Sequence, residues 1–136
     1  MTSPILALRA AILTVLLSDE LLLSDLGGPE IFVVAPAGAT PPYITFGEAK
    51  AEEWSSVDMT GHRHRIVLDV WSREGGDAEA LGISNRLFEI VESASFRPEG
   101  HDLVDLSILS QTIATPSSNG ITNVQIQIEA FTEVSA

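Results

Sequence analysis

The sequence predicts an α+β protein with a mainly antiparallel β-sheet of about four strands, helices packed on one face and a C-terminal β-hairpin. The observations that predict it are the patterns along the chain, namely an apolar helical run, short strands, an amphipathic helix and two long strand patterns. With 136 residues and 45% apolar residues, the chain has the size and core of one globular domain. We therefore expect a single domain over residues 1–136.

The first element is a helix that follows Ser3 and Pro4, a good N-cap and first-turn pair. Residues 5–17 contain no helix breaker, and Arg9 is their sole charged residue. We therefore expect both sides of this helix to be covered, by other elements or by a neighbouring subunit. A secretory signal or membrane anchor is disfavoured, because no basic region precedes the apolar run and the run is too short to span a bilayer.

Short elements follow the first helix. A helical turn over residues 21–26 ends at a glycine pair and a proline. Residues 30–34 predict a short strand or an extended arm, and residues 35–42 predict an exposed loop, because their Ala, Gly and Pro content cannot pack a core. Residues 43–47 predict a compact strand, whereas the acidic stretch 48–58 is either a strand that turns outward or a loop.

The strand predicted at residues 66–71 carries apolar side chains on both faces. One face should meet the core. The other holds Val67 and Trp71, so we expect it to be partly covered as well, which on a small sheet often means a partner chain. The first face is formed by Ile66, Leu68 and Val70, and the second by Val67, Asp69 and Trp71.

An amphipathic helix and a hairpin complete the predicted fold. Asp77 is a plausible N-cap for a helix over residues 78–94, and a charge at Leu87 or Phe88 should unfold it. Two strand patterns begin at Leu103 and Ile121, and the Asn-Gly pair between them is typical of a hairpin turn. The predicted buried stripe of the helix consists of Ala80, Leu81, Ser84, Leu87, Phe88 and Val91.

The composition excludes several classes of function. Nineteen acidic residues against seven basic residues give a net charge of −12, which opposes a phosphate-binding surface but is compatible with a lumen through which DNA slides. The absence of cysteine excludes disulfides and thiolate metal sites.

The only metal-site candidate is a histidine pair. His62 and His64 point to the same side if their segment is extended, and Asp58 or His101 could complete a site. We favour a polar strand entry at the sheet rim, because zinc sites normally show three or four ligands at recognisable spacing. We therefore expect no metal and no cofactor.

No catalytic motif is present. Residues 82–86 depart from a nucleophile elbow where Arg86 replaces the last glycine, and Ser84 would lie within a helix. Glu52 and Glu53 are adjacent and need not converge, so a solvated face explains them better than a general acid and base. We expect no catalytic residues and no enzyme activity.

Residues 41–76 are instead the best candidate for a contact surface. They hold both tryptophans, the single tyrosine and a short basic cluster in an acidic chain. Aromatic residues are enriched in protein interfaces, and a basic cluster suits an acidic neighbour. The candidate subunit or partner interface consists of Trp54, His62, Arg63, His64, Arg65 and Trp71.

The order of these motifs resembles the tail terminators, or tail-completion proteins, of long-tailed phages and gene transfer agents. The resemblance covers nearly the whole chain, although each motif alone is only moderately specific. It is carried by the apolar helix at 5–17, the PYITFG strand at 42–47, the histidine-rich lead into 66–72, the Gly-rich turn and helix at 75–94, and the C-terminal hairpin with its Gln-Ile-Gln-Ile ending.

The resemblance implies a homohexameric ring that caps the tail tube, stops its polymerisation and joins the tail to the head or neck. The implied partners are further copies of the chain, the major tail tube protein and a head-tail connector or neck protein. DNA would pass through the ring without sequence-specific binding, and no membrane is involved. The implied location is the head-tail junction of a virion or phage-like particle that is assembled in the host cytoplasm.

Two alternatives remain open at this point. The first is a head-side connector or stopper protein of the neck, which shares the small size and the ring habit. The second is a small cytosolic ligand-binding domain or enzyme that uses His62 and His64, with His101.

Overall fold

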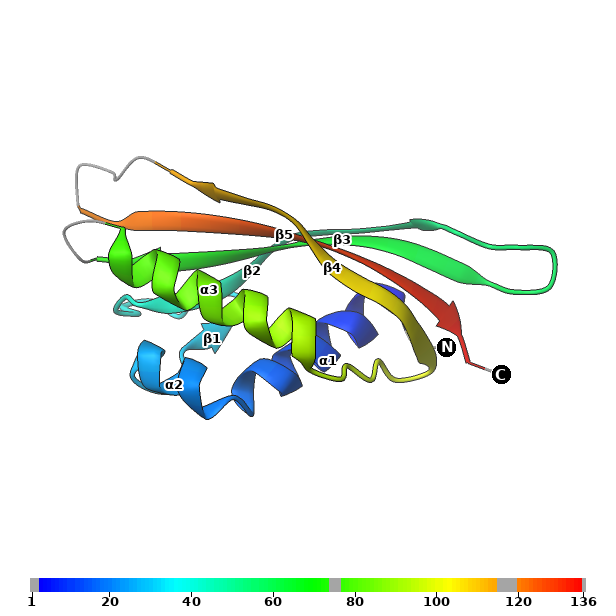
Figure 1. The fold of residues 1–136 in the computed structure, drawn as a ribbon, viewed down its shortest axis with the longest axis horizontal. Helices are drawn as coiled ribbons and strands as arrows, with labels where there is room; N and C mark the ends of the chain where they lie inside the picture. The colour runs from blue at the N-terminus through cyan, green and yellow to red at the C-terminus, as the bar shows by residue number, and fades with distance from the viewer. Residues whose placement is uncertain (1–2, 74–76, 115–119, 136) are drawn as a thin grey trace.

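Three helices lie on one side of a five-stranded sheet, and within the described residues no helix covers the other side (Figure 1). The computed structural model describes residues 3–73, 77–114 and 120–135. The elements are α1 (Pro4–Leu17), α2 (Glu20–Leu26), β1 (Ile31–Phe32), β2 (Tyr43–Glu53), β3 (Gly61–Ser72), α3 (Ala78–Ser93), β4 (His101–Ile113) and β5 (Thr122–Val134).

The sheet has the strand order β1-β2-β3-β5-β4. Strand β1 is parallel to β2, and the remaining neighbours are antiparallel, so the predicted α+β class is confirmed. The predicted C-terminal hairpin is also present, as β4 pairs with β5. Of the predicted Asn-Gly turn, Asn119 lies outside the described residues, while Gly120 has a φ of +80° that suits glycine.

The first two helices begin at the capping residues that their sequences offer. The Ser3 hydroxyl accepts a hydrogen bond from the Leu6 N–H, and Pro4 occupies the first turn of α1. The Asp19 carboxylate caps α2 by accepting a bond of 2.8 Å from the Leu22 N–H. Helix α2 ends at Gly27, whose φ of +78° is the left-handed conformation common at helix C-termini.

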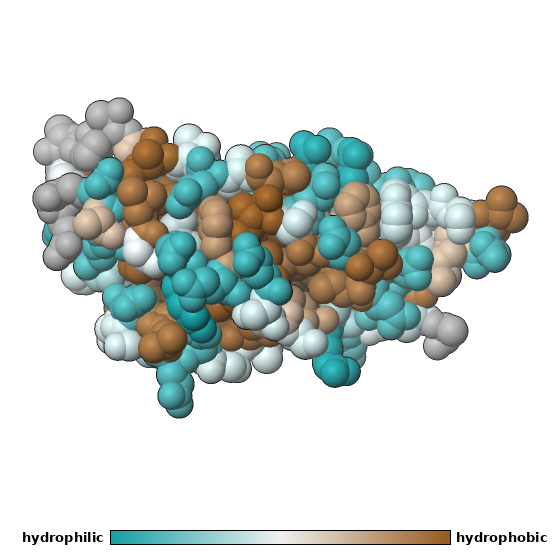
Figure 2. All heavy atoms as spheres, viewed as in Figure 1, coloured by the Kyte–Doolittle hydropathy of each residue, from teal (hydrophilic) through white to brown (hydrophobic). Residues whose placement is uncertain are grey.

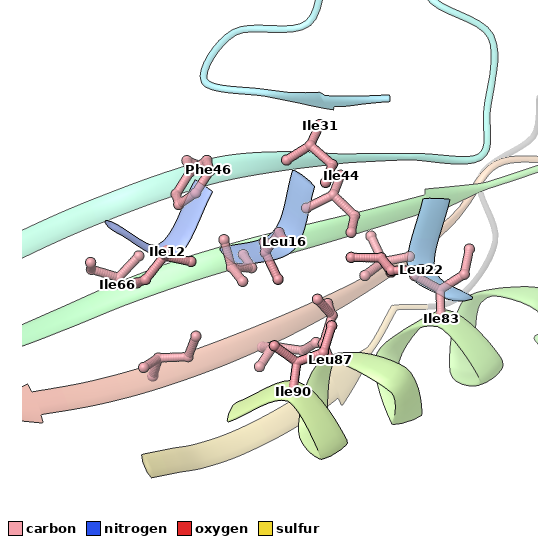
Figure 3. Packing of buried hydrophobic residues seen from close by; sticks show 14 of the residues in the cluster. Ile12, Leu16, Leu22, Ile31, Ile44, Phe46, Ile66, Ile83, Leu87 and Ile90 are labelled. Carbon is pink, nitrogen blue, oxygen red and sulfur yellow. The ribbon is translucent and has the colours of Figure 1, made fainter. Parts of the chain in front are cut away.

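The core lies between the helices and the sheet (Figure 3). The predicted inward face of β3 is confirmed, because Ile66, Leu68 and Val70 are all buried in it. Helix α1 is only partly covered, since Leu6 and Leu17 are exposed in the isolated chain. The buried side chains that α1, α2 and α3 contribute include Leu8, Ile12, Leu16, Leu22, Leu26, Ile83, Leu87 and Ile90.

Helix α3 is rotated relative to the predicted stripe. Ile83 and Ile90, which the prediction omitted, are buried, whereas Phe88 and Val91 are only partly buried. The reason is that α3 packs over β3 and β5, while its side towards β4 borders a groove. The predicted stripe is therefore correct at Ala80, Ser84 and Leu87, whereas Phe88 and Val91 on its β4 side are only partly buried.

The acidic stretch after residue 47 is mostly strand. Strand β2 passes through an irregularity between Phe46 and Ala49 and continues to Glu53, and β3 begins at Gly61, earlier than predicted. Ser56 and Met59 pair across the turn, where the Ser56 N–H donates to the Met59 carbonyl at 2.9 Å. The resulting hairpin extends beyond the helices at one end of the molecule (Figure 1). No helix among the described residues is long and apolar enough to cross a membrane.

Candidate assembly surfaces

The basic cluster at residues 62–65 is divided between the two sides of the sheet. Because successive side chains of a strand alternate, His62 and His64 face the helix side together with Ile66. Arg63 and Arg65 face the side without helices, which we call the bare face. The cluster is continuous in sequence but does not form one patch.

The cations of the bare face are paired within the same chain. Lys50 Nζ lies 2.6 Å from Glu52 Oε1, and Arg63 Nη2 lies 2.7 Å from Glu52 Oε2. Hydrogen bonds from Lys50 and then Arg63 lower the pKa of Glu52. Arg65 Nε lies 3.5 Å from Glu129 Oε2. Exposed pairs of this kind contribute little to stability, so their effect is mainly on the charge of the face.

The bare face remains acidic after this pairing. Its paired strand positions carry the cations Lys50, Arg63 and Arg65. The uncharged positions of the face hold amide and hydroxyl side chains together with the apolar residues Val67, Trp71 and Phe131. The carboxylates that the strand pairing places on this face are Glu52, Asp69, Asp102, Asp105, Glu129 and Glu133. Asp69 is buried, so five carboxylates and three cations remain at the surface, and this excess of negative charge repels a polyanion such as DNA.

Trp54 lies near the tip of the β2–β3 hairpin. Its ring packs against Phe131 with a centroid distance of 4.8 Å, yet the residue remains 42% exposed. Gly61 lies beside it, and a Cβ at this position would come within 2.5 Å of the Trp54 carbonyl oxygen. The tryptophan thus has one side fixed on β5 and another open to contact.

Trp71 lies at the other end of the bare face and is partly buried. Its Nε1–H donates a 2.9 Å hydrogen bond to Thr45 Oγ1, and its ring centroid lies 6.4 Å from that of Tyr43. Tyr43 in turn lies 6.1 Å from Phe32. Trp71 is therefore built into an aromatic row within the chain.

The fold brings the three histidines together on the helix side. The ring of His62 lies 6.2 Å from that of His64 and 6.4 Å from that of His101. His64 Nε2 shares a 2.9 Å hydrogen bond with Thr132 Oγ1, and His101 Nδ1 bonds to the Glu99 carbonyl oxygen at 2.8 Å. Within the described residues, Nδ1 of His62 and Nδ1 of His64 are buried without a partner.

Burial keeps His64 neutral. It lowers the pKa of His64 to about 4, with smaller contributions from His62 and His101. Among the residues that the structure describes, no three histidine, cysteine, aspartate or glutamate side chains are placed to hold a metal ion. The cluster is a packed group of imidazoles beside the first residues of β3.

An apolar groove between α3 and β4 was not foreseen from the sequence. It has a volume of about 400 Å³, and hydrophobic residues gather between these two elements (Figure 2). Irregularities in β4 lie at Val104 and Leu109, and both side chains are exposed, as is Ile113. The groove is lined by Phe88, Val91, Glu92, Leu106, Ser107, Ile108, Leu109, Ser110 and Gln111.

A second groove follows the outer side of α1. It has a volume of about 460 Å³ and lies between this helix and the segment that precedes β4, where Arg97 and Glu99 line it. Small side chains such as Ala10 and Thr14 form its floor on α1. The side of α1 that we expected to be covered is thus open in the isolated chain.

Comparisons with known proteins show the family of the chain. None of the curated proteins matches the chain. A chain in the virion of a native gene transfer agent particle has the same fold, with a TM-score of 0.87 and 20% sequence identity over 97% of this chain and 99% of that one. The molecule falls in the class of structural virion proteins. The family model described as tail completion protein gp17 matches residues 10–133, and the chain belongs to this family. It is a structural protein of the virion tail.

Proposed function

We propose that the protein is a tail terminator, a homohexameric ring that caps the tail tube, stops its polymerisation and joins the tail to the head or neck. Membership of the tail-completion family supports action at the end of the tail. The observation that carries the ring is the asymmetry of the fold, with three helices on one face of the sheet and a bare acidic face on the other. Such a subunit has distinct surfaces for a channel and for its neighbours.

In this proposal the bare face lines the lumen. DNA that passes through a channel must not adhere to the wall, and the excess of carboxylates supplies repulsion at short range. Arg63 and Arg65 offset only the charge of Glu52 and Glu129, with which they pair, so the remaining carboxylates still give the face an excess of negative charge. The major tail tube protein and a neck protein would contact the two rims of the ring.

The proposal is tested on the purified protein and on particles. Light scattering after size exclusion should give a closed ring, with negative-stain images showing a central hole. Particles that lack the protein should carry tails of uncontrolled length. A monomer under all conditions, together with normal tail length in its absence, would refute the terminator function. A label on Ser135 distinguishes the tail end from the portal side, where a head-side connector would lie.

We also infer that the protein works without catalysis. In the part of the chain that the structure describes, the histidine cluster is the group that an enzyme or ligand-binding domain would use first, and His64 is fully buried and neutral within it. Replacing His62 and His101 by alanine and His64 by glutamine should leave tail completion intact in particles grown near neutral pH. Loss of completion by a folded triple variant would contradict this inference.

A further inference from the structure

We propose that residues 33–42 of one copy, which we call the arm, bind in the α3–β4 groove of the next copy. The proposal rests on the ring described above and specifies the contact that closes it. Its occupant is a second copy of this chain, and the arm contributes Val33 and Val34 to the contact.

The arm is an exposed apolar segment without charge. Val33 is 41% exposed and Val34 is 83% exposed, directly after the short strand β1. Residues 33–42 contain no acidic or basic side chain. Within the arm, the Ala39 N–H donates to the Pro36 carbonyl in a turn. Two adjacent valines that stay in water leave apolar surface exposed, so their burial against a partner is favourable.

The groove offers a matching surface. Partly buried Phe88 and Val91 form its α3 wall, and Leu106 and Ile108 form its β4 wall. Leu109 stands at the rim on an irregularity of the edge strand and is 43% exposed. The volume of about 400 Å³ is sufficient for two valine side chains and part of the backbone that carries them.

The absence of charged residues distinguishes the arm from the exposed apolar segment at the hairpin tip. Every copy carries a net charge of −12, so contacts between copies are favoured where few carboxylates meet. Among the residues lining the groove, Glu92 is the single charged one. The hairpin tip also exposes an aliphatic residue, Val57, but Asp58 lies next to it and Glu53 close by. The uncharged arm brings no further carboxylate to the groove.

The topology makes this contact intermolecular. The arm follows β1 at one edge of the sheet, and β4 forms the opposite edge. Four strand spacings, roughly 19 Å, separate these edges. Because β1 and β2 hold both ends of the arm, Val34 stays at its own edge. A contact between two different surfaces of identical subunits is heterologous, and such a contact repeats around a closed ring.

The contact is made by side chains rather than by an added strand. Pro36, Pro41 and Pro42 have no N–H to donate to a ladder. The irregularities at Val104 and Leu109 interrupt the outer edge of β4, which also disfavours strand addition. Both partners therefore present apolar side chains while their backbones oppose pairing.

A cross-linking experiment tests the proposal without background from native thiols of this chain, because the chain has no cysteine. Particles carrying Val34→Cys together with Leu109→Cys are treated with a short bifunctional thiol reagent. We expect a ladder of covalent multimers that ends at the ring size, whereas each single variant should remain monomeric. The matched control pairs Leu21→Cys with Leu109→Cys, since Leu21 is also exposed, at 62%, but lies on α2.

The outcomes separate this contact from the ring itself. Absence of the ladder in particles with normal tails and intact rings would overturn the arm contact and leave the ring standing. Attachment of the Val34→Cys variant to a different virion protein by the same reagent would overturn it as well. If the wild-type protein formed no ring at all, the proposed function would fail, and the arm contact with it.

Purified protein gives a second test. Val34→Asp and Leu109→Asp should each abolish the ring while leaving the subunit folded. When the two variants are mixed, the intact arm of Leu109→Asp can bind the intact groove of Val34→Asp, but the free arm and free groove of that complex are both defective, so it cannot propagate. We therefore expect a heterodimer and nothing larger. Rings formed by either variant alone would contradict the proposal.

Discussion

Arg86 of α3 donates two parallel hydrogen bonds to the carboxylate of Asp19, the N-cap of α2. Arg86 Nε lies 3.0 Å from Asp19 Oδ1, and Arg86 Nη2 lies 2.6 Å from Asp19 Oδ2. The same carboxylate caps α2 through Leu22. One aspartate therefore both starts a helix and ties it to another helix that is 67 residues away in sequence.

Substitution at Asp19 should separate these two roles. Asp19→Ala removes the cap and the ion pair, and loss of the cap alone costs about 1 kcal/mol. Asp19→Asn keeps a capping oxygen and loses the charge, so it should be the milder variant. The free energies of unfolding in urea check this order. Equal losses in the two variants would show that the cap contributes nothing.

The same ion pair should fail in acid. The hydrogen bond from Arg86 lowers the pKa of Asp19 below its usual value of 3.8. Because the folded-state pKa is depressed, the stabilisation is present above pH 3.8 and is lost as the pH falls through the folded value. Wild-type protein should therefore lose stability below pH 4 more steeply than Asp19→Asn. If the free energy of unfolding fell equally with pH in both proteins, the Arg86–Asp19 ion pair would not be the cause.

His64 should make stability pH-dependent at a higher pH. Its folded pKa is lowered to about 4 from 6.5, so between these values the unfolded chain binds a proton that the folded chain excludes. The contribution of neutral His64 to the free energy of unfolding is fully present above pH 6.5 and declines towards pH 4, by roughly 3 kcal/mol in total. His64→Gln, measured by urea unfolding across this range, should flatten the decline. If the loss of stability with falling pH were as steep in His64→Gln as in the wild type, other groups would be its cause.

Gly61 and Gly82 form a matched pair for testing the hairpin. A Cβ at Gly61 would approach the Trp54 carbonyl oxygen at 2.5 Å and the Thr132 carbonyl oxygen at 3.0 Å, so Gly61→Ala should cost about 1–3 kcal/mol. At Gly82, in α3, a Cβ would meet nothing within 4 Å. Gly82→Ala should therefore stabilise by up to about 1 kcal/mol. Thermal unfolding of both variants measures the contrast.

Leu87 and Phe88 are neighbours with different burial. Leu87 is 1% exposed in the core, so Leu87→Asp should cost at least the roughly 2–5 kcal/mol of a Leu→Ala change and leave the chain largely unfolded. Phe88 borders the α3–β4 groove, so Phe88→Asp should give a folded but weakened subunit that no longer forms rings. Circular dichroism and light scattering distinguish the two outcomes. Unfolding by both changes would contradict the different placement of these residues.

Charge reversal of Arg63 and Arg65 should affect assembly more than folding. Both cations are exposed, so loss of their pairs with Glu52 and Glu129 changes stability little. Each Arg→Glu change, however, replaces a positive charge by a negative one and so lowers the net charge of an already acidic face by two units. The double variant should form fewer rings at physiological salt than the control with Arg9→Glu and Arg73→Glu, which makes the same change in net charge at positions outside the paired strands of this face. Intact rings from the first variant would count against this surface.

The sequence predicted those features that depend on local chemistry. Ser3 caps α1 because its hydroxyl reaches an N–H three residues on, and this needs no tertiary contact. The alternation of β3 placed Ile66 on the core face for the same reason. The candidate interface was only partly predictable. Strand alternation already separates His64 from Arg65, but their partners Thr132 and Glu129 come from a distant strand, so the contacts themselves could not be predicted.

Features that depend on how elements cross were not accessible from one sequence. The position of α3 over β3 and β5 decides that Ile90 is buried and Phe88 is not fully buried, although both fit a helical stripe. The groove beside Leu109 likewise forms between α3 and the irregular strand β4, so it could be predicted only once the packing of these two elements was known. The meeting of His101 with His62 was raised as an option, but the spacing of 39 residues carried no signal that could decide it.

The irregular edge of β4 also bears on the life of the subunit before assembly. A long, regular and exposed strand is a template on which other chains polymerise into aggregates. In β4 the ladder is disturbed at two places, so the outer edge presents no uninterrupted row of backbone groups. An unassembled copy therefore exposes Leu109 at an edge that other chains cannot easily extend, and its net charge of −12 opposes aggregation further.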